Sequence, residues 1–161
     1  MSFGLNPDEW LQMLIDAHGE YNLEPLSIRK AVVCCVFANH LPEHLFSRYG
    51  ASDPAKLRGA TSLDSYRGHI AAAEPALAVI RDLCDYAKHG PALARKSVTV
   101  AKTEQSSALA MDSLSFFMGI YNHRQVEKLI VTHKDGSIAW VEGYLFKATR
   151  FWQGEFKAAS L

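Results

Sequence analysis

The first ninety residues follow a helical pattern of apolar positions. Asn6-Pro7-Asp8-Glu9 combines a capping residue, a first-turn proline and acids near the positive end of the dipole, so a helix is expected to begin there. Gly19 is expected to end it. The apolar positions of this helix recur at three- and four-residue spacing, namely Trp10, Leu11, Leu14 and Ile15.

A second helix is expected from Ser27 through the run 31–38. This run is apolar on every side, which predicts the central buried helix of the fold. Pro42 lacks a backbone N–H and is expected to interrupt the helix, kinking or restarting it. Two further helices are predicted at 62–73 and 76–89, and Gly90-Pro91 is a strong signal that the second of them stops.

After residue 95 the pattern changes to alternation. Residues 97–100 alternate and carry β-branched side chains, and 129–140 contains two such runs on either side of Asp135-Gly136, which predicts a hairpin. The segment 107–118 fits a strand or a helix equally well. Helical spacing returns from Val141 to Phe156 and predicts a closing amphipathic helix.

These elements predict an α+β fold. It has an N-terminal bundle of three to four helices, a small antiparallel sheet or hairpin region, and a closing C-terminal helix. A chain of 161 residues is of the size of one domain and buries a sizeable core without disulfides or metals. We therefore expect a single domain over 1–161, with a helical part at 1–90, a β-region at 96–140 and the last helix at 141–158.

Charge and cysteine content narrow the function classes. Lys and Arg number 17 and so do Asp and Glu, so net charge does not indicate nucleic acid as a partner. The segment 88–102 is nevertheless locally basic. Three cysteines without CxxC spacing favour a reducing, cytoplasmic setting, and the N-terminus resembles no signal peptide. Apolar runs far shorter than the roughly 18 residues of a span predict no membrane insertion.

The helix predicted at 76–89 carries the densest cluster of reactive side chains. Asp82, Asp85 and His89 fall within about 60° of one another, opposite the apolar face, and Arg81 and Lys88 flank them. Three interpretations remain open. The cluster is a solvated face with an Arg81–Asp85 pair, a divalent metal site completed from another helix, or a buried polar interface or catalytic row at a dimer contact or under the β-region.

The helical region with an Arg–His row near a helix end resembles the HEPN domains, many of which are ribonucleases of toxin and phage-defence systems. In that family an Arg, usually followed by a polar residue, is separated from a His by four to six residues, and two copies of the motif meet at a dimer interface. The resemblance covers residues 8–89 and implies catalytic roles for Arg81, Asp82 and His89. Seven residues separate Arg81 from His89 here.

His40-Leu-Pro-Glu43-His44 spells the H-x-x-E-H motif of inverzincin metallopeptidases. In that motif two histidines bind zinc and the glutamate activates water, so the resemblance implies a metal site at His40, Glu43 and His44. The alternative is a kinked helix in which His40 is half-buried with its hydrogen bonds satisfied and His44 faces water, because Pro42 disturbs the regular geometry that the site needs.

Two hypotheses about function follow. No phosphate-binding glycine loop or nucleophile elbow occurs, and the sequence predicts no cofactor. The first hypothesis is a non-catalytic interaction module, acting as a homodimer, that contacts a protein partner or an acidic ligand through Asp85, Lys88, Arg95 and Lys96. The second is a HEPN-like ribonuclease or a metal-dependent hydrolase that uses Arg81, Asp82, Asp85 and His89.

The order of elements supports a wider likeness as well. A helix ending in Asp82…Lys88-His89, a β-region and a closing helix with Phe151-Trp152 resemble small bacterial proteins of the same plan. This likeness covers most of the chain and implies no activity.

Overall fold

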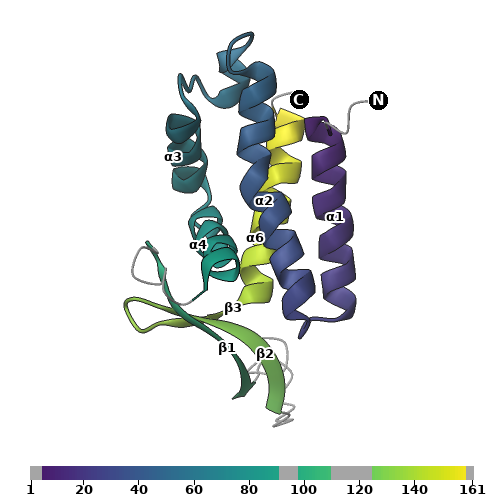
Figure 1. Ribbon diagram of the computed structural model, residues 1–161, viewed down its shortest axis with the longest axis vertical. Coiled ribbons are helices and arrows are strands. Elements are labelled where there is room, and N and C mark those ends of the chain that lie inside the picture. The colour runs from purple at the N-terminus through teal and green to yellow at the C-terminus, as the bar shows by residue number, and fades with distance from the viewer. Residues whose placement is uncertain (1–4, 91–97, 110–124, 159–161) are drawn as a thin grey trace, which may run out of the picture.

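The computed structural model describes residues 5–90, 98–109 and 125–158 (Figure 1). In these ranges the chain forms helices, a short 3-10 turn and three strands, and so has the α+β fold expected from the sequence. Their bounds are α1 (Pro7–Leu23), α2 (Ile28–Tyr49), η1 (Pro54–Leu57), α3 (Leu63–Ala73), α4 (Ala76–His89), β1 (Val100–Leu109), β2 (Gln125–His133), β3 (Ile138–Trp140) and α6 (Val141–Ala158).

Helices α1, α2, α4 and α6 form the bundle. Helix α2 packs against the other three, and α6 also contacts α1 and α4, so the last helix closes the ring rather than lying outside it (Figure 1). Helix α3 lies beside α2 and α4, and the sheet lies across the end of the bundle at which α4 ends and α6 begins. The largest side chains that are almost fully buried between these elements are Trp152, Tyr21 and Tyr66.

Helix α1 begins where the sequence predicts and ends later. Asn6 and Glu9 form a capping box, in which each side chain accepts a hydrogen bond from the backbone N–H of the other residue. The predicted end at Gly19 is wrong, because α1 continues to Leu23. Tyr21 is 1% exposed in the added turn, and its burial offsets the cost of about 1 kcal/mol for a glycine inside a helix.

Helix α2 runs through Pro42 without a break, so the expected restart of the helix at this proline is wrong. Pro42 has no N–H to donate to the carbonyl of Ala38, four residues earlier. The indole Nε1 of Trp152 donates to that carbonyl at 3.2 Å, and the indole of Trp10 donates to the preceding carbonyl, of Phe37, at 2.8 Å. Side chains from α6 and α1 thus supply hydrogen bonds to the stretch of α2 that the proline disturbs.

The sheet is antiparallel in the order β1-β2-β3. The predicted hairpin is confirmed: β2 and β3 flank a turn in which Gly136 has φ +84° and the Asp135 side chain accepts from the Ser137 N–H. Strand β1 begins at Val100, three residues later than the predicted 97. Of the ambiguous segment, 107–109 belong to β1, and 110–118 lie outside the described residues.

Helix α6 also holds the sheet in place. His133 on β2 and Tyr144 on α6 are joined by a hydrogen bond of 2.6 Å between Nε2 and the hydroxyl. Among the described residues no helix combines the length and the apolar character needed to cross a bilayer.

Candidate functional site

The polar row on α4 is divided by the fold. Asp82, which the helical wheel places opposite the apolar face, is only 2% exposed, because β1 begins over it. Its Oδ2 accepts hydrogen bonds from the Thr99 N–H at 2.6 Å, the Thr99 hydroxyl at 2.8 Å and the Val100 N–H at 3.1 Å. The interpretation of Asp82, Asp85 and His89 as a solvated helix face is therefore wrong for Asp82.

These hydrogen bonds determine the charge of Asp82. Burial on its own raises the pKa of the carboxyl, but the bonds from Thr99 and Val100 outweigh it and hold the pKa below its ordinary value. The group is therefore an ionised carboxylate that joins α4 to β1. Its Oδ2 is already surrounded by donors, which leaves this oxygen no room to take a proton from a substrate.

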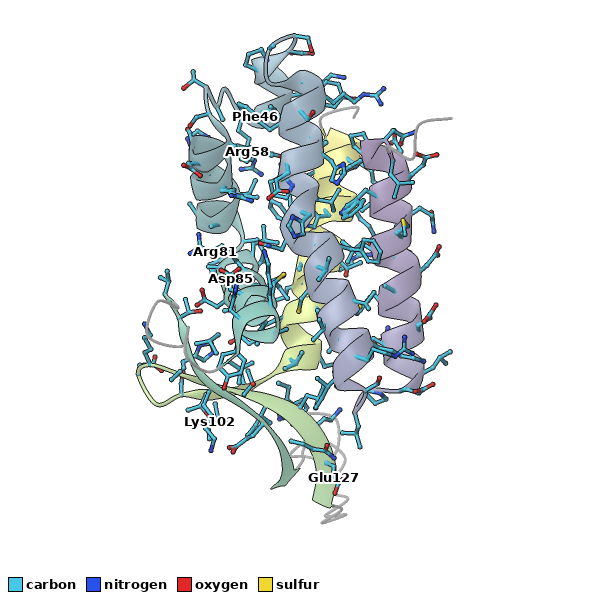
Figure 2. The ribbon with its side chains drawn as sticks, in the orientation of Figure 1. Phe46, Arg58, Arg81, Asp85, Lys102 and Glu127 are labelled. Carbon is cyan, nitrogen blue, oxygen red and sulfur yellow. The ribbon has the colours of Figure 1, made fainter. Side chains whose placement is uncertain are left out.

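The other members of the row, Arg81, Asp85, Lys88 and His89, are exposed. Arg81 and Asp85 lie one turn apart on α4 (Figure 2) but do not form the expected ion pair with one another, although the structure describes both. The rise of a helix separates Arg81 from His89 by about 12 Å along the axis. The proposed ligand-binding residues Arg95 and Lys96 lie outside the described residues.

Arg81 lines a groove between α2, α3 and α4 with a volume of about 430 Å³, which we call the α3–α4 groove. Arg67 and Asp64 of α3 and Asn39 of α2 supply its other polar groups. Apolar side chains make most of the remaining wall: Ala38, Pro42, Ile70, Ala71, Leu77, Ala78, Val98 and Trp152. The groove thus offers guanidinium groups beside an apolar surface.

The two guanidinium groups of the groove have different surroundings. Arg67 pairs with Glu43 of α2, whose carboxylate also shares a 2.8 Å hydrogen bond with His40 Nδ1. No ion pair or hydrogen bond to the Arg81 side chain is present within the described residues. Arg81 is therefore the cation of the groove that remains open to a ligand.

The H-x-x-E-H residues do not converge. His40 turns to Glu43, whereas the ring of His44 stacks on Trp10 with centroids 4.1 Å apart. His40 is half-buried and hydrogen-bonded, and His44 is partly covered by the indole rather than facing water. Across the parts of the chain that the structure describes, no group of His, Cys, Asp and Glu side chains is arranged to hold a metal ion.

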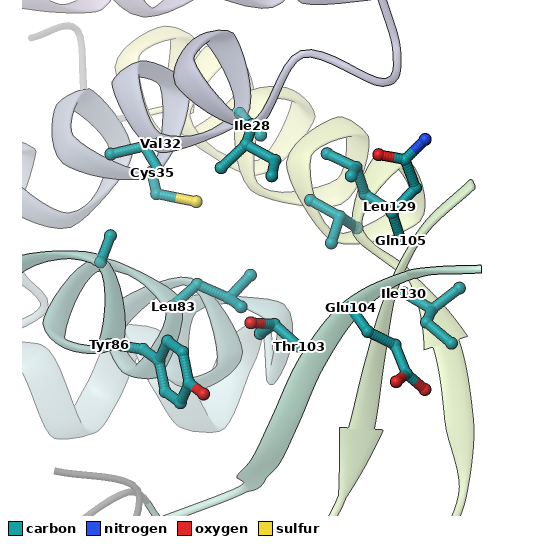
Figure 3. A pocket seen from close by; sticks show the side chains of 13 residues that line it. Ile28, Val32, Cys35, Leu83, Tyr86, Thr103, Glu104, Gln105, Leu129 and Ile130 are labelled. Atoms are coloured by element: carbon teal, nitrogen blue, oxygen red, sulfur yellow. The ribbon is translucent and has the colours of Figure 1, made fainter. Parts of the chain in front are cut away.

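A second hollow of about 300 Å³ lies between α2, α4 and the sheet (Figure 3). Its lining is mostly apolar, with Ile28, Val32 and Cys35 from α2 and Leu83 from α4, while Thr103, Glu104 and Gln105 of β1 form its sheet side. Burial raises the pKa of the Cys35 thiol well above its ordinary value, so the thiol is protonated and unreactive. The lining described here therefore supplies no activated nucleophile.

Sequence reasoning identified Arg81 but missed Arg67, Asp64 and Asn39 as its neighbours. The sequence does not show that Arg67 and Arg81 face the same groove, because they lie on separate helices joined at Glu74-Pro75. A detectable signal was the short link between two amphipathic helices, which predicts that they lie close together.

The chain was compared with protein-family models, curated proteins and solved structures, and none of the three comparisons found a match.

Proposed function

We propose that this protein is a non-catalytic binding module that takes a small acidic ligand in the α3–α4 groove. The observation that carries the proposal is the position of Arg81, an unpaired guanidinium among the described residues, in a groove whose walls are otherwise mostly apolar. Arginine binds carboxylate and phosphate groups through paired N–H donors. The ligand class is thus an acid with an apolar body, which the groove wall covers.

The positions of Asp82 and His89 in the fold favour ligand binding over catalysis. Asp82 is committed to Thr99 and Val100, and His89 lies about two helical turns from Arg81. A general base must lie within hydrogen-bond reach of the group that it deprotonates. Inside one chain, the remaining polar groups of the groove are an aspartate, an amide and the paired Arg67, which suit orientation of a ligand.

The test is calorimetric titration with two probes, octanoate and inorganic phosphate. We expect octanoate to bind and Arg81→Ala to weaken binding by roughly ten- to a hundredfold, the loss of one charge-assisted contact. Arg81→Lys is expected to retain part of the affinity for octanoate that Arg81→Ala loses. Arg29→Ala is the matched control, since Arg29 is an exposed arginine near the far end of α2. Absence of binding to wild type, or equal binding by Arg81→Ala, contradicts the proposal.

The HEPN-like alternative makes a different prediction for the same variants. Hydrolysis of a labelled RNA by the wild type, abolished by His89→Ala and by Arg81→Ala, would favour a ribonuclease. A binding module leaves the RNA intact, and His89→Ala then binds octanoate as the wild type does.

A further inference from the structure

Strand β1 is a long edge strand. It is ten residues long and pairs with β2 on one side except at Ala101, where the register shifts, and the strand order leaves no described strand on the other side. Ala101, Lys102 and Gln105 are exposed along it. Unpaired N–H and C=O groups on an open edge are a template for pairing with another strand, and natural proteins cover such edges or break them with prolines and charges.

The two charges on this edge are of opposite sign and lie two residues apart. Thr103 is paired with Val131, which is fully buried, so Thr103 is on the sheet face toward the helices. Lys102 and Glu104 therefore share the opposite face, where they form an ion pair within the strand. Figure 2 labels Lys102 on the sheet, away from the bundle.

This pattern is complementary to itself. If two β1 strands pair antiparallel about a two-fold axis at Thr103, Lys102 of each copy lies opposite Glu104 of the other. The symmetry makes two such cross-strand pairs, and Thr103 faces its own equivalent. An axis at Lys102 or at Glu104 places that residue opposite its own copy, so that like charges meet. An axis midway between Thr103 and either neighbour places Lys102 opposite uncharged Thr103 or Gln105, so the charges favour the register centred on Thr103.

We propose that two copies of this chain associate by antiparallel pairing of their β1 edges about Thr103. The inference goes beyond the proposed function, because no residue of the α3–α4 groove takes part. The apolar hollow of Figure 3 extends the surface available to the second copy. Residues 103–105 are consecutive and all line the hollow, so it reaches the strand backbone. Ile28 beside it is 61% exposed. Association joins the described three-stranded sheets of the two copies into one continuous sheet.

The test is the mass of the protein across a concentration series, by light scattering and native mass spectrometry. We expect a dimer for the wild type. Lys102→Glu and Glu104→Lys each replace two attractive pairs by two repulsive ones and should raise the dissociation constant by roughly tenfold or more. The double variant Lys102→Glu/Glu104→Lys restores complementarity and the dimer. Lys147→Glu, a charge reversal at an exposed position on α6, is the control and should leave the dissociation constant unchanged.

Mixing the two single variants distinguishes the effect of charge pairs between the two copies from the effect of the ion pair within each strand. A heterodimer of Lys102→Glu with Glu104→Lys has opposite charges at both cross-strand positions, although neither chain regains its own ion pair. We expect this heterodimer to form in preference to either homodimer. A wild type that stays monomeric overturns the proposal, as does a dimer that persists in both single variants or a mixture without heterodimer. Circular dichroism of each variant verifies that it is folded.

Discussion

The carboxylate of Asp82 shows how one side chain connects two parts of the fold. The oxygen that accepts from Thr99 and Val100 lies on α4, and its donors lie 17 and 18 residues later, at the start of β1. No other hydrogen bond from the Thr99 N–H is present in the described part of the chain. Loss of the carboxylate therefore leaves a partly buried donor without a partner, which is more costly than the absence of a hydrogen bond at the surface.

We expect Asp82→Ala to lower the free energy of unfolding by about 3 kcal/mol, because it removes charge-assisted bonds and leaves polar groups unsatisfied. Urea denaturation at neutral pH measures the change. Asp85→Ala, an exposed aspartate one turn along α4, is the matched control and should cost less than about 0.5 kcal/mol. Equal effects of the two substitutions would show that the Asp82 carboxylate contributes nothing specific.

The same carboxylate gives the stability a pH dependence. The pKa of Asp82 in the folded protein lies below its ordinary value of 3.8, so the folded state binds the proton less well than the unfolded state does. Its contribution is complete above that ordinary value and is lost as the pH falls through the folded pKa. We expect the difference in unfolding free energy between wild type and Asp82→Ala to shrink in acid, as measured by urea titrations from neutral pH downward.

At the scale of elements, the continuity of α2 depends on a side chain from α6. Pro42 leaves the Ala38 carbonyl without its usual backbone donor. The buried Trp152 indole donates a hydrogen bond to that carbonyl instead, with 3.2 Å between Nε1 and the oxygen. The hydrogen bond joins residues 114 positions apart. The contact explains how a proline is accommodated in the middle of a helix of 22 residues.

The two residues should be coupled energetically. Trp152→Phe is expected to destabilise the protein by about 1–3 kcal/mol through the lost hydrogen bond and the lost volume. In a Pro42→Ala background the backbone N–H at position 42 can donate to the carbonyl instead, so the same change should cost less. Thermal or urea unfolding of the four proteins of the cycle gives the coupling. Trp10→Phe in the same backgrounds is the control, because its acceptor is Phe37, and it should couple weakly.

At the scale of the whole molecule, the helical part and the last helix form one core. Leu145, Ala148 and Trp152 of α6 are at most 1% exposed, and they pack among α1, α2 and α4. Residues 5–90 therefore leave a large apolar surface open when α6 is absent.

We expect a chain that ends at Gly90 to lose the cooperative thermal transition of the full protein, because its buried surface no longer offsets the chain entropy. Circular dichroism and calorimetry against the full-length chain measure this. A sharp transition in the shortened chain would show that residues 1–90 fold on their own, and would assign α6 a peripheral role.

The sequence was informative where local chemistry decides structure. The capping residue Asn6, the helix start near Ser27, the helix end before Gly90 and the turn at Asp135-Gly136 all appear at the expected positions. It was wrong in ending α1 at Gly19 and in restarting α2 at Pro42, where local preference favours an end or a break. Each of these preferences amounts to a few kcal/mol at most, and tertiary burial of Tyr21 and the indole bond from Trp152 outweigh it.

The sequence by itself determined the α+β class, the helices of the N-terminal part, the hairpin and the closing helix, because periodicity and turn residues act over a few positions. Tertiary structure alone decided that Asp82 is buried, that Arg81 and Arg67 share a groove, and that His40 and His44 diverge. These relations depend on which elements cover a given helix face. A helical wheel describes one helix and contains no information about what lies against it.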